Sequence, residues 1–544
     1  MPGGGLFSLV AYGAQNVLLS GNPDFTYFYK TYKKYSHFAE ESVTFSMDGS
    51  PQLSYDQPVQ VRFKFQRIAD LVRDMYFVCD LPDIYCKYID VNLPQYGRTS
   101  QYNFAWSQYI GCQILQNVAF FIGGQKIQEF DGNYMITKAQ CDLDSRSFTK
   151  WSRLVGNVPE LYDPAKGIYG GGSTGTGYPL VYNNNGPDPA STTTPPNTNR
   201  PSIQGRQLQV PLPFWFAEST FESLPLVALQ YHECEVQITL RPINQLYSIL
   251  DINGEANGQM VAPGYRFNPS INALQPQNCY YTPVSTITDV TINNFLTDVG
   301  TPNPLLNTWP LNPRIELTYV YVTDEERIKF SSEPLQYLVR QITSYNFTDI
   351  INRQFVELDT HNPIERLLIV PRRSDSVLYR NQPANYSNWI NPLKPPFIPS
   401  GVYTPAGTLQ NPANPWPQNV NLTSATGMQV LNGQRSIMNT FTVLGDGNPL
   451  QEEKPTAYFT QVVPWKYLKG IPDPEILVYP FSLQSPTTQP DGSINSSRIK
   501  SFQLDLNVFP LPTNSLYQYN ITVYVESLNW VSIASGMGGL KYAL

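Results

Sequence analysis

The sequence has little charge for its length. Asp, Glu, Lys and Arg make up 15% of its 544 residues, against about 25% in average globular proteins. The net charge of -7 offers no broad basic field to a phosphate backbone. The densest basic cluster is Lys30, Lys33 and Lys34, which lies among tyrosines. We therefore expect no direct binding of nucleic acid.

Histidine is also scarce. His37, His232 and His361 are far apart and form no His-x-His or His-Glu-x-x-His pattern, whereas a metal enzyme needs several imidazoles around one ion. His232 and Glu233 could act as an acid/base pair, but no nucleophile accompanies them, so an ordinary strand histidine is the better interpretation. We expect no metal, no cofactor and no catalytic residue.

The chain has six cysteines and no Cys-x-x-Cys pair, which is typical of reduced, buried thiols in a cytosolic protein. No apolar run approaches the ~18 residues of a membrane helix. The apolar stretch Leu6 to Leu19 has no basic residue before it and is interrupted by polar ones, unlike a signal peptide. These features predict a soluble protein made on cytosolic ribosomes.

Proline, by contrast, is abundant, and 48 of them argue against a mainly helical protein. Hydrophobic residues at 41% and aromatic residues at 13% are too many for intrinsic disorder. Apolar and polar residues alternate with the period of a half-buried strand in four segments: 59–66, 234–241, 502–508 and 521–526. One short helix is predicted over Thr323 to Phe330, where Thr323 and Glu326 have capping-box spacing.

Two features bear on domain organisation. Long segments rich in Gly, Pro, Asn, Ser and Thr predict surface loops at 163–205, 251–312 and 379–426. The string Ile122 to Lys126 is echoed by Leu431 to Arg435, and each follows a strand-like run and contains a dipeptide suited to hairpin turns. The echo favours two related β domains in tandem.

Several motif matches carry no function. Residues 170–177 contain G-x-G-x-x-G and, around Ser173, G-x-S-x-G, but neither lies between a strand and a helix, as a dinucleotide site or nucleophile elbow requires. Five sequons are candidate glycosylation acceptors, with unmodified surface asparagine as the simpler interpretation for each. They are at Asn346, Asn385, Asn421, Asn495 and Asn520.

The segment from Gly3 to Ala39, which contains LVAYGAQ and SGNP, resembles the start of major capsid proteins of nucleocytoplasmic large DNA viruses. Further blocks are similar to that family in the family's order, and the most specific of these are LPLVALQYHE from Leu224 and SGMGGL from Ser535. Other matching blocks begin at Asp70, Ile122, Val210, Tyr321 and Gly492. The resemblance spans nearly the whole chain.

The resemblance implies an all-β fold of two tandem eight-stranded antiparallel jelly rolls with long surface loops and a few short helices. It predicts an N-terminal arm at 1–24, a first jelly roll at 25–242 and a linker or insertion at 243–311. A second jelly roll at 312–534 and a C-terminal tail at 535–544 would follow. The loops at 163–205 and 379–426 would build the outer end of the molecule.

The resemblance also implies a structural protein that forms homotrimers, which tile the shell of an icosahedral virion as pseudo-hexagonal capsomers. Its partners would be neighbouring capsomers, minor capsid proteins, the inner membrane and surface glycans, and assembly would take place in the host cytoplasm. Two alternatives remain open: a minor or vertex-specific capsid paralogue with the same fold, and a carbohydrate-binding or hydrolytic jelly roll.

Overall fold

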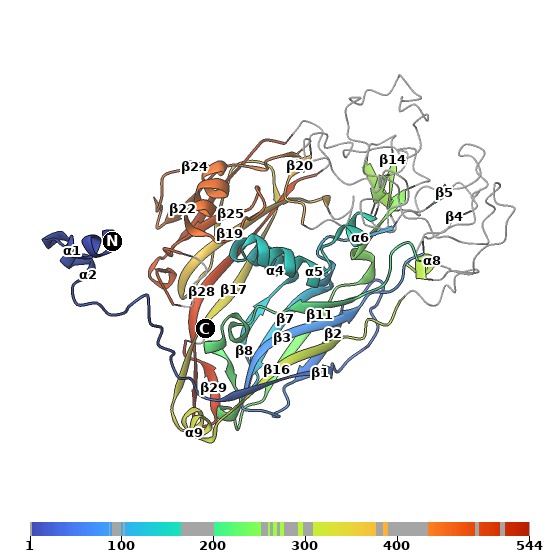
Figure 1. Cartoon of the computed structure of the whole chain (residues 1–544). Helices are drawn as coiled ribbons and strands as arrows, with labels where there is room; N and C mark the ends of the chain where they lie inside the picture. Colours follow the sequence, from blue (N-terminus) through green and yellow to red (C-terminus); the bar gives the residue numbers. More distant parts are fainter. Residues whose placement is uncertain are drawn as a thin grey trace.

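The computed structural model is built from antiparallel β-sheets (Figure 1). It describes residues 3–85, 88–89, 100–101, 104–164, 201–251, 259–261, 265–268, 273–276, 292–296, 308–376, 384–389, 434–484, 489–511 and 517–542. Most of the predicted loops at 163–205, 251–312 and 379–426 therefore lie outside the described residues, as do Cys86, Cys279 and Asn421. Within the described part, no helix is both long and apolar enough to cross a bilayer.

The first sandwich consists of two facing sheets. One has the order β1-β16-β3-β10, with β9 also paired to β3, and the other has the order β2-β11-β7-β8. Buried and less buried residues alternate strictly along β11, and in β2 the buried Val61 and Phe63 alternate with exposed residues. The reason is that apolar side chains point into the core and polar ones point away from it. The bounds are β1 (Phe38–Ser46), β2 (Val59–Lys64), β3 (Leu71–Asp80), β7 (Leu115–Ile122), β8 (Gln125–Phe130), β9 (Gln207–Pro211), β10 (Leu224–Pro225), β11 (Cys234–Leu240) and β16 (Arg314–Val322).

The second sandwich repeats this plan. One sheet has the order β17-β28-β19-β25, with β26 paired to β19 and β29 to β28, and the other has the order β18-β27-β22-β23, with β24 paired to β22. The bounds are β17 (Leu335–Ile350), β18 (Gln354–Glu357), β19 (Pro363–Arg373), β22 (Met438–Gly445), β23 (Asn448–Pro449), β24 (Lys454–Pro455), β25 (Leu477–Pro480), β26 (Ile494–Asn495), β27 (Phe502–Val508), β28 (Tyr519–Ala534) and β29 (Met537–Leu540).

The two sandwiches are wound alike. The first strand of each pairs with its long closing strand, β1 with β16 and β17 with β28. The second strand of each pairs with the strand before that one, β2 with β11 and β18 with β27, and apart from the extra hairpin strand β29 the others follow in matching positions. This is the winding of a jelly roll, which closes two antiparallel sheets over one core. The prediction of two tandem antiparallel jelly rolls is confirmed at this level.

The predicted boundary between the two domains at residue 312 is wrong. The strand β16 pairs with β1 over nine residues, from Arg314 opposite Ser46 to Val322 opposite Phe38, and on its other side with β3. It is the closing strand of the first sandwich, so residues 243–311 are an insertion within that sandwich. Alternation identifies a strand but not its partner, which is why the sequence did not reveal this.

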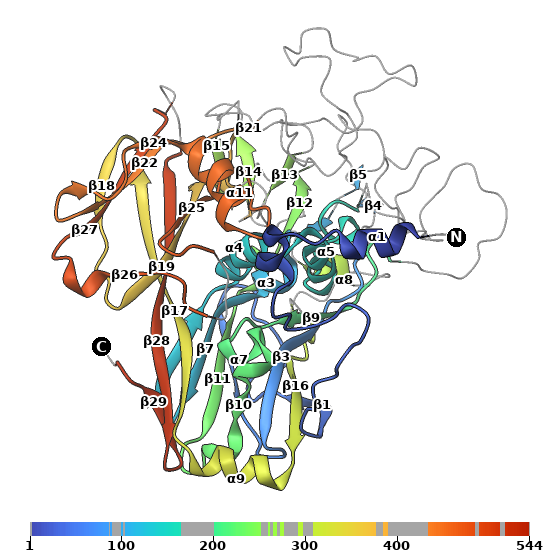
Figure 2. The same cartoon turned by 60° about the vertical axis from the view of Figure 1, so that its left-hand side comes forward.

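Both ends of the chain also differ from the predicted boundaries. Residues 535–544 are not a free tail, because β29 pairs with β28 through a turn at Ser535 and Gly536. At the other end, every residue from 3 to 37 is exposed and β1 begins only at Phe38. We call residues 3–37 the arm. Figure 1 shows it as an extension separate from the two sandwiches, and Figure 2 shows the same arm from another side.

Helix α9 (Asp324–Ser332) connects the two sandwiches, and its position confirms the helix predicted over 323–330. The Thr323 side chain makes no capping hydrogen bond. Instead, the Asp70 carboxylate accepts hydrogen bonds from the Val322 backbone N–H, at 3.1 Å, and from the Arg327 guanidinium, at 2.8 Å. The start of the helix is thus held by the residue that precedes β3.

Short elements fill the connections. The helical ones are α1 (Gly4–Val10), η1 (Ala14–Asn16), α2 (Val17–Ser20), α3 (Ile110–Ile114), α4 (Gly132–Asp142), α5 (Ser145–Leu154), α6 (Pro159–Tyr162), α7 (Trp215–Glu218), η3 (Thr220–Glu222), η4 (Leu226–Ala228), η5 (Ile243–Gln245), α8 (Asn293–Leu296), η8 (Tyr458–Val462), α11 (Val463–Tyr467) and η9 (Ser496–Arg498). The remaining strands are β4 (Tyr88–Ile89), β5 (Ser100–Gln101), β6 (Phe104–Trp106), β12 (Tyr247–Asp251), β13 (Gln259–Val261), β14 (Tyr265–Asn268), β15 (Ala273–Pro276), β20 (Asn388–Trp389) and β21 (Gln434–Arg435).

The described cysteines agree with the prediction of buried thiols. Cys79, Cys112, Cys141 and Cys234 are all free and buried. Burial raises the pKa of Cys141 and Cys234 to about 12, which keeps both thiols protonated. Because the thiolate is the reactive form, these four side chains behave as small apolar core residues.

The turn between β7 and β8 explains one half of the sequence echo. Gly123 and Gly124 both have positive φ, at 57° and 82°, as a two-residue hairpin turn of type I′ requires. The corresponding turn of the second sandwich, between β22 and β23, uses Asp446 and Gly447, at 50° and 79°. The turn that corresponds to β7–β8 is therefore at Asp446 and Gly447, and not at the echoed residues 431–435. Residues 431–433 lie outside the described part of the chain.

We expect the two neighbouring glycines to respond differently to alanine. A Cβ atom on Gly124 would have no atom within 4 Å, so Gly124→Ala should cost only the strain of a left-handed residue, about 1–2 kcal/mol. A Cβ atom on Gly123 would lie 2.6 Å from the His232 ring, so Gly123→Ala should lower the unfolding temperature further. Calorimetry of both variants measures this difference, and equal shifts would contradict the close approach.

Candidate functional site

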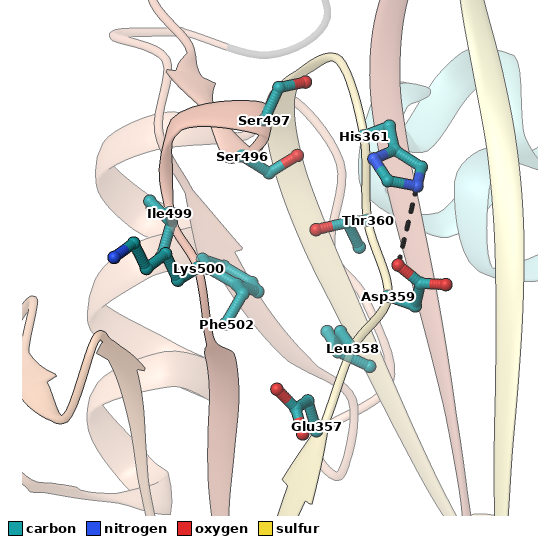
Figure 3. A pocket seen from close by; sticks show the side chains of 10 residues that line it. All are labelled: Glu357, Leu358, Asp359, Thr360, His361, Ser496, Ser497, Ile499, Lys500 and Phe502. Atoms are coloured by element: carbon teal, nitrogen blue, oxygen red, sulfur yellow. Dashed lines mark ion pairs between the residues drawn. The ribbon is translucent and has the colours of Figure 1, made fainter. Parts of the chain in front are cut away.

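A polar cavity of about 480 Å³ lies between the β18–β19 loop and η9 (Figure 3). Its His361 Nε2 lies 3.5 Å from an Asp359 carboxylate oxygen. The Ser496 hydroxyl donates to the Asn362 carbonyl at 2.8 Å, and the Ser497 hydroxyl accepts from the Asn362 N–H at 3.1 Å. Both hydroxyls are thus engaged with backbone, and neither is hydrogen-bonded to the imidazole. The cavity lacks the nucleophile–base pair that covalent catalysis needs.

The other predicted residues do not form a site either. His232 Nδ1 lies 2.9 Å from the Gly538 carbonyl oxygen, so this histidine contacts the C-terminal hairpin instead of forming an acid/base pair with Glu233. His37 is exposed in the arm. In the part of the chain that the structure describes, no three His, Cys, Asp or Glu residues are grouped closely enough to hold a metal ion.

Two of the sequon asparagines lie near each other on adjacent strands. Asn346 on β17 is exposed, and its Oδ1 accepts a hydrogen bond from the Thr522 hydroxyl at 2.8 Å. Asn520 on β28 is half-buried. The other two described sequons are separate from this pair: Asn385 is half-buried and hydrogen-bonded to Ser387, and Asn495 is exposed. Exposure makes Asn346 and Asn495 the more accessible candidates for modification.

In the part of the chain that the structure describes, a group of charges, most of them buried, lies where the two sandwiches meet, and we call it the junction cluster. Its centre is Arg366 on β19, whose side chain is fully buried. The guanidinium donates to both carboxylate oxygens of Asp142 at 2.6 and 3.0 Å, and to both of Glu526 at 2.6 and 2.9 Å. Asp142 ends helix α4 of the first sandwich, whereas Arg366 and Glu526 belong to the second. Arg366 therefore joins the two.

Further charges complete the junction cluster. Lys138 Nζ lies 2.9 Å from Asp142 and 3.1 Å from Glu218, and Arg340 pairs with Glu218 and Glu365. The Tyr134 hydroxyl donates to Glu526 at 2.7 Å. The cluster comprises Lys138, Arg340, Arg366, Asp142, Glu218, Glu365 and Glu526. Each of these charges has at least one opposite charge within ion-pair distance, as buried charges require.

The geometry fixes the charge states of the two central carboxylates. Burial alone would raise the pKa of Asp142, but Arg366 and Lys138 hold it well below its usual range. The same balance lowers the pKa of Glu526. A lowered pKa contributes stability above about pH 4, and this stability is lost as the pH falls through the folded-state value.

Sequence reasoning missed the junction cluster. The available signal was a charged pair, Glu365 and Arg366, within the otherwise apolar strand 364–370, together with Glu526 within the apolar segment 521–533. A charge inside a buried strand must find a partner. The sequence could have shown that a partner exists, but not that it lies on a helix of the other sandwich.

The C-terminal hairpin fastens the two sandwiches at a second place. The Gly536 carbonyl accepts from the Tyr231 N–H at 2.9 Å, and the Leu540 N–H donates to Gln125 Oε1 at 3.1 Å. A Cβ atom on Gly538 would lie 2.7 Å from the Leu229 side chain. The glycines of the SGMGGL segment are therefore needed for close approach of β29 to the first sandwich.

The comparisons with known proteins agree across the chain. Residues 26–263 match the family model "Major capsid protein N-terminus", and residues 326–539 match "Large eukaryotic DNA virus major capsid protein". The chain belongs to this major capsid protein family. Curated relatives include the major capsid proteins of Phaeocystis pouchetii virus and Paramecium bursaria Chlorella virus 1, each 24% identical over 99% of both chains.

Solved structures of capsid proteins share the fold. The PBCV-1 capsid model has a TM-score of 0.59 at 19% identity and covers 95% of this chain and 100% of its own. The Faustovirus major capsid protein has a TM-score of 0.61 at 14% identity, with 97% and 96% covered. The predicted family and the double jelly-roll fold are confirmed. As a member of this capsid family, the chain has a structural role and is not an enzyme.

We expect Arg366→Met to destabilise this capsid protein by about 3–5 kcal/mol, because Asp142 and Glu526 would remain buried without their cation. The measurement is the calorimetric unfolding temperature at pH 7. The control is Lys64→Met, which removes an exposed pair with Glu233 at 3.0 Å and should leave that temperature unchanged. Equal effects of the two substitutions would show that the junction cluster adds nothing beyond a surface pair.

A second expectation concerns Glu222, which lies next to the junction cluster. Burial and the Glu218 carboxylate raise its pKa to about 7, with Arg340 opposing. A raised pKa means that the folded protein disfavours the ionised carboxylate. The free energy of unfolding therefore decreases as the pH rises from about 4.5 to 7. Glu222→Gln should raise the unfolding temperature at pH 8 by about 1–3 °C and leave it unchanged at pH 4. Glu325→Gln on exposed α9 is the control, and a shift that is the same at both pH values would refute the raised pKa.

Proposed function

We propose that this chain forms homotrimers with a pseudo-hexagonal outline, and that these trimers tile the outer shell of an icosahedral large DNA virus. The observation that carries this proposal is the duplicated winding of the two sandwiches. Three copies of a chain with two similar barrels bring six similar barrels around one axis. Such a unit can meet its neighbours on six comparable sides.

The body of the molecule supplies surfaces suited to such contacts. Several large apolar side chains on it are exposed, among them Phe221 at 93%, Trp465 at 85% and Ile471 at 79%. Aromatic residues are enriched in interface cores. A head-to-tail contact repeated around a three-fold axis uses each surface once and then closes, so growth stops at the trimer.

Further partners belong to the same proposal. Neighbouring capsomers would contact the outer flanks, while minor capsid proteins and the inner membrane would meet the inner face. Asn346 and Asn495 are the sequons whose exposure suits a glycan. Assembly would take place in the host cytoplasm. The low and negative net charge supports the expectation that this chain does not hold the genome directly.

Native mass spectrometry tests the central claim. The full chain should appear at about three times its mass of 61.5 kDa. Because aromatic residues carry much of an interface, Trp465→Glu should shift the population toward monomer if this side chain lies in the contact. Lys64→Met again serves as the surface control. A chain that remains monomeric at high micromolar concentration would overturn the proposal.

A second candidate is a minor or vertex-specific capsid component with the same fold. One relative, from Acanthamoeba polyphaga mimivirus, carries the name "Probable capsid protein 4" and is 22% identical over 99% of both chains, so numbered capsid proteins occur among the relatives. Copy number per particle separates the candidates. A shell protein is present in thousands of copies, and a vertex protein in a small multiple of twelve.

A further inference from the structure

Within the described residues, the arm is the longest exposed segment rich in apolar side chains. Between Gly3 and Pro23 it contains no Asp, Glu, Lys or Arg. Its side chains are far more exposed than those of a folded segment, with Leu18 at 92% and Phe28 at 98%. Its exposed large apolar residues are Leu6, Phe7, Leu9, Val10, Tyr12, Val17, Leu18, Leu19, Phe25, Tyr27, Phe28, Tyr29, Tyr32 and Tyr35.

The arm cannot hold its own structure in water. Its helices α1 and α2 have seven and four residues and bury nothing. Isolated helices shorter than about 12 residues are marginal even for favourable sequences. The hydrogen bonds of its side chains stay within residues 4–28. A surface supplied from elsewhere is needed to order it.

The body carries a groove of matching character. This cavity of about 590 Å³, which we call the flank groove, lies among β3, α4, α5 and α7. Most of its lining residues are apolar, and the charged ones at its sides are of both signs: Asp74, Lys138, Asp142, Glu218 and Lys469. The apolar lining residues are Met75, Met135, Leu143, Trp151, Leu212 and Ala217. Methionine side chains adapt to the shape of a partner, which suits a groove that receives a helix.

Within one chain the arm does not fill the flank groove. Figure 1 shows α1 and α2 standing clear of the sandwiches, and in Figure 2 they are drawn in front of α4 and α5. Residues 24–37 tether the apolar part of the arm to β1, and at about 3.3 Å per residue these 14 residues could span up to about 46 Å. A tether of this length lets the apolar part dock well away from its own β1.

We propose that in the trimer the apolar part of the arm, residues 3–23, docks into the flank groove of a neighbouring copy. This inference rests on the proposed trimer. Each copy supplies one arm and one groove, so a three-fold ring satisfies all of them at once. An uncharged segment suits apolar walls, whereas helices that bind lipid surfaces carry Lys or Arg on their polar face, which this segment lacks.

Photo-crosslinking with mixed labels tests the proposal. The substitution Leu18→p-benzoyl-phenylalanine places the probe in the arm, and equal amounts of light and ¹⁵N-labelled full-length chains are co-assembled. Mass spectrometry should then identify links from residue 18 to peptides that contain Met135 or Trp151, with about half of them joining a light to a heavy chain. The same probe at Phe355 on β18, which is 58% exposed and does not line the flank groove, is the control and should not give these links.

A groove-filling variant sharpens the test. Ala217→Trp should reduce the links about tenfold by occupying the flank groove, while Phe355→Trp on exposed β18 should not. Trimers that form without these links, or with links only within one copy, would overturn the inference and leave the proposed function standing. Links that appear only to phosphatidylserine vesicles would likewise overturn it, in favour of a membrane. Absence of trimers would overturn both.

Discussion

The arrangement of the two barrels depends on one buried cation. Arg366 has no exposed surface, and its guanidinium is shared between Asp142 of the first sandwich and Glu526 of the second. A planar, bidentate donor restricts direction as well as distance, so the group resists rotation of one sandwich against the other. An apolar contact of similar size would allow more sliding. For a shell subunit, a fixed angle between barrels matters more than the net stability of the ion pairs.

Two other contacts support the same angle. The hairpin β28–β29 brings its glycines against Tyr231 and Leu229 of the first sandwich, and strand β8 lies beside β17, with Gln341 donating to the Ile127 carbonyl at 3.2 Å. These contacts lie at different places along the junction. Together with Arg366 they hold the two barrels as one stiff body.

The sequence predicted the fold class because period-two alternation and abundant proline leave few alternatives to sheets and turns. It also located helix α9 within two residues at its C-terminal end. It could not assign β16, because strand pairing over hundreds of residues leaves no local pattern: Ser42 and Glu316, hydrogen-bonded at 2.8 Å, are 274 residues apart. The junction cluster was missed for a similar reason, since Asp142 on α4 and Arg366 on β19 meet only in three dimensions. The glycines of SGMGGL were recognised as a family feature, but their steric role needed the neighbouring side chains.

The late arrival of β16 has a consequence for synthesis. The first sandwich needs this strand to cover the gap between β1 and β3, yet residues 314–322 leave the ribosome only after the whole insertion that precedes them. Until then, the edges of β1 and β3 that β16 will cover are unpaired in the nascent chain, and they could pair with strands of other chains. The chain would therefore pass through a vulnerable stage whose duration is set by the length of its own insertion, and chaperones would be needed most during that interval.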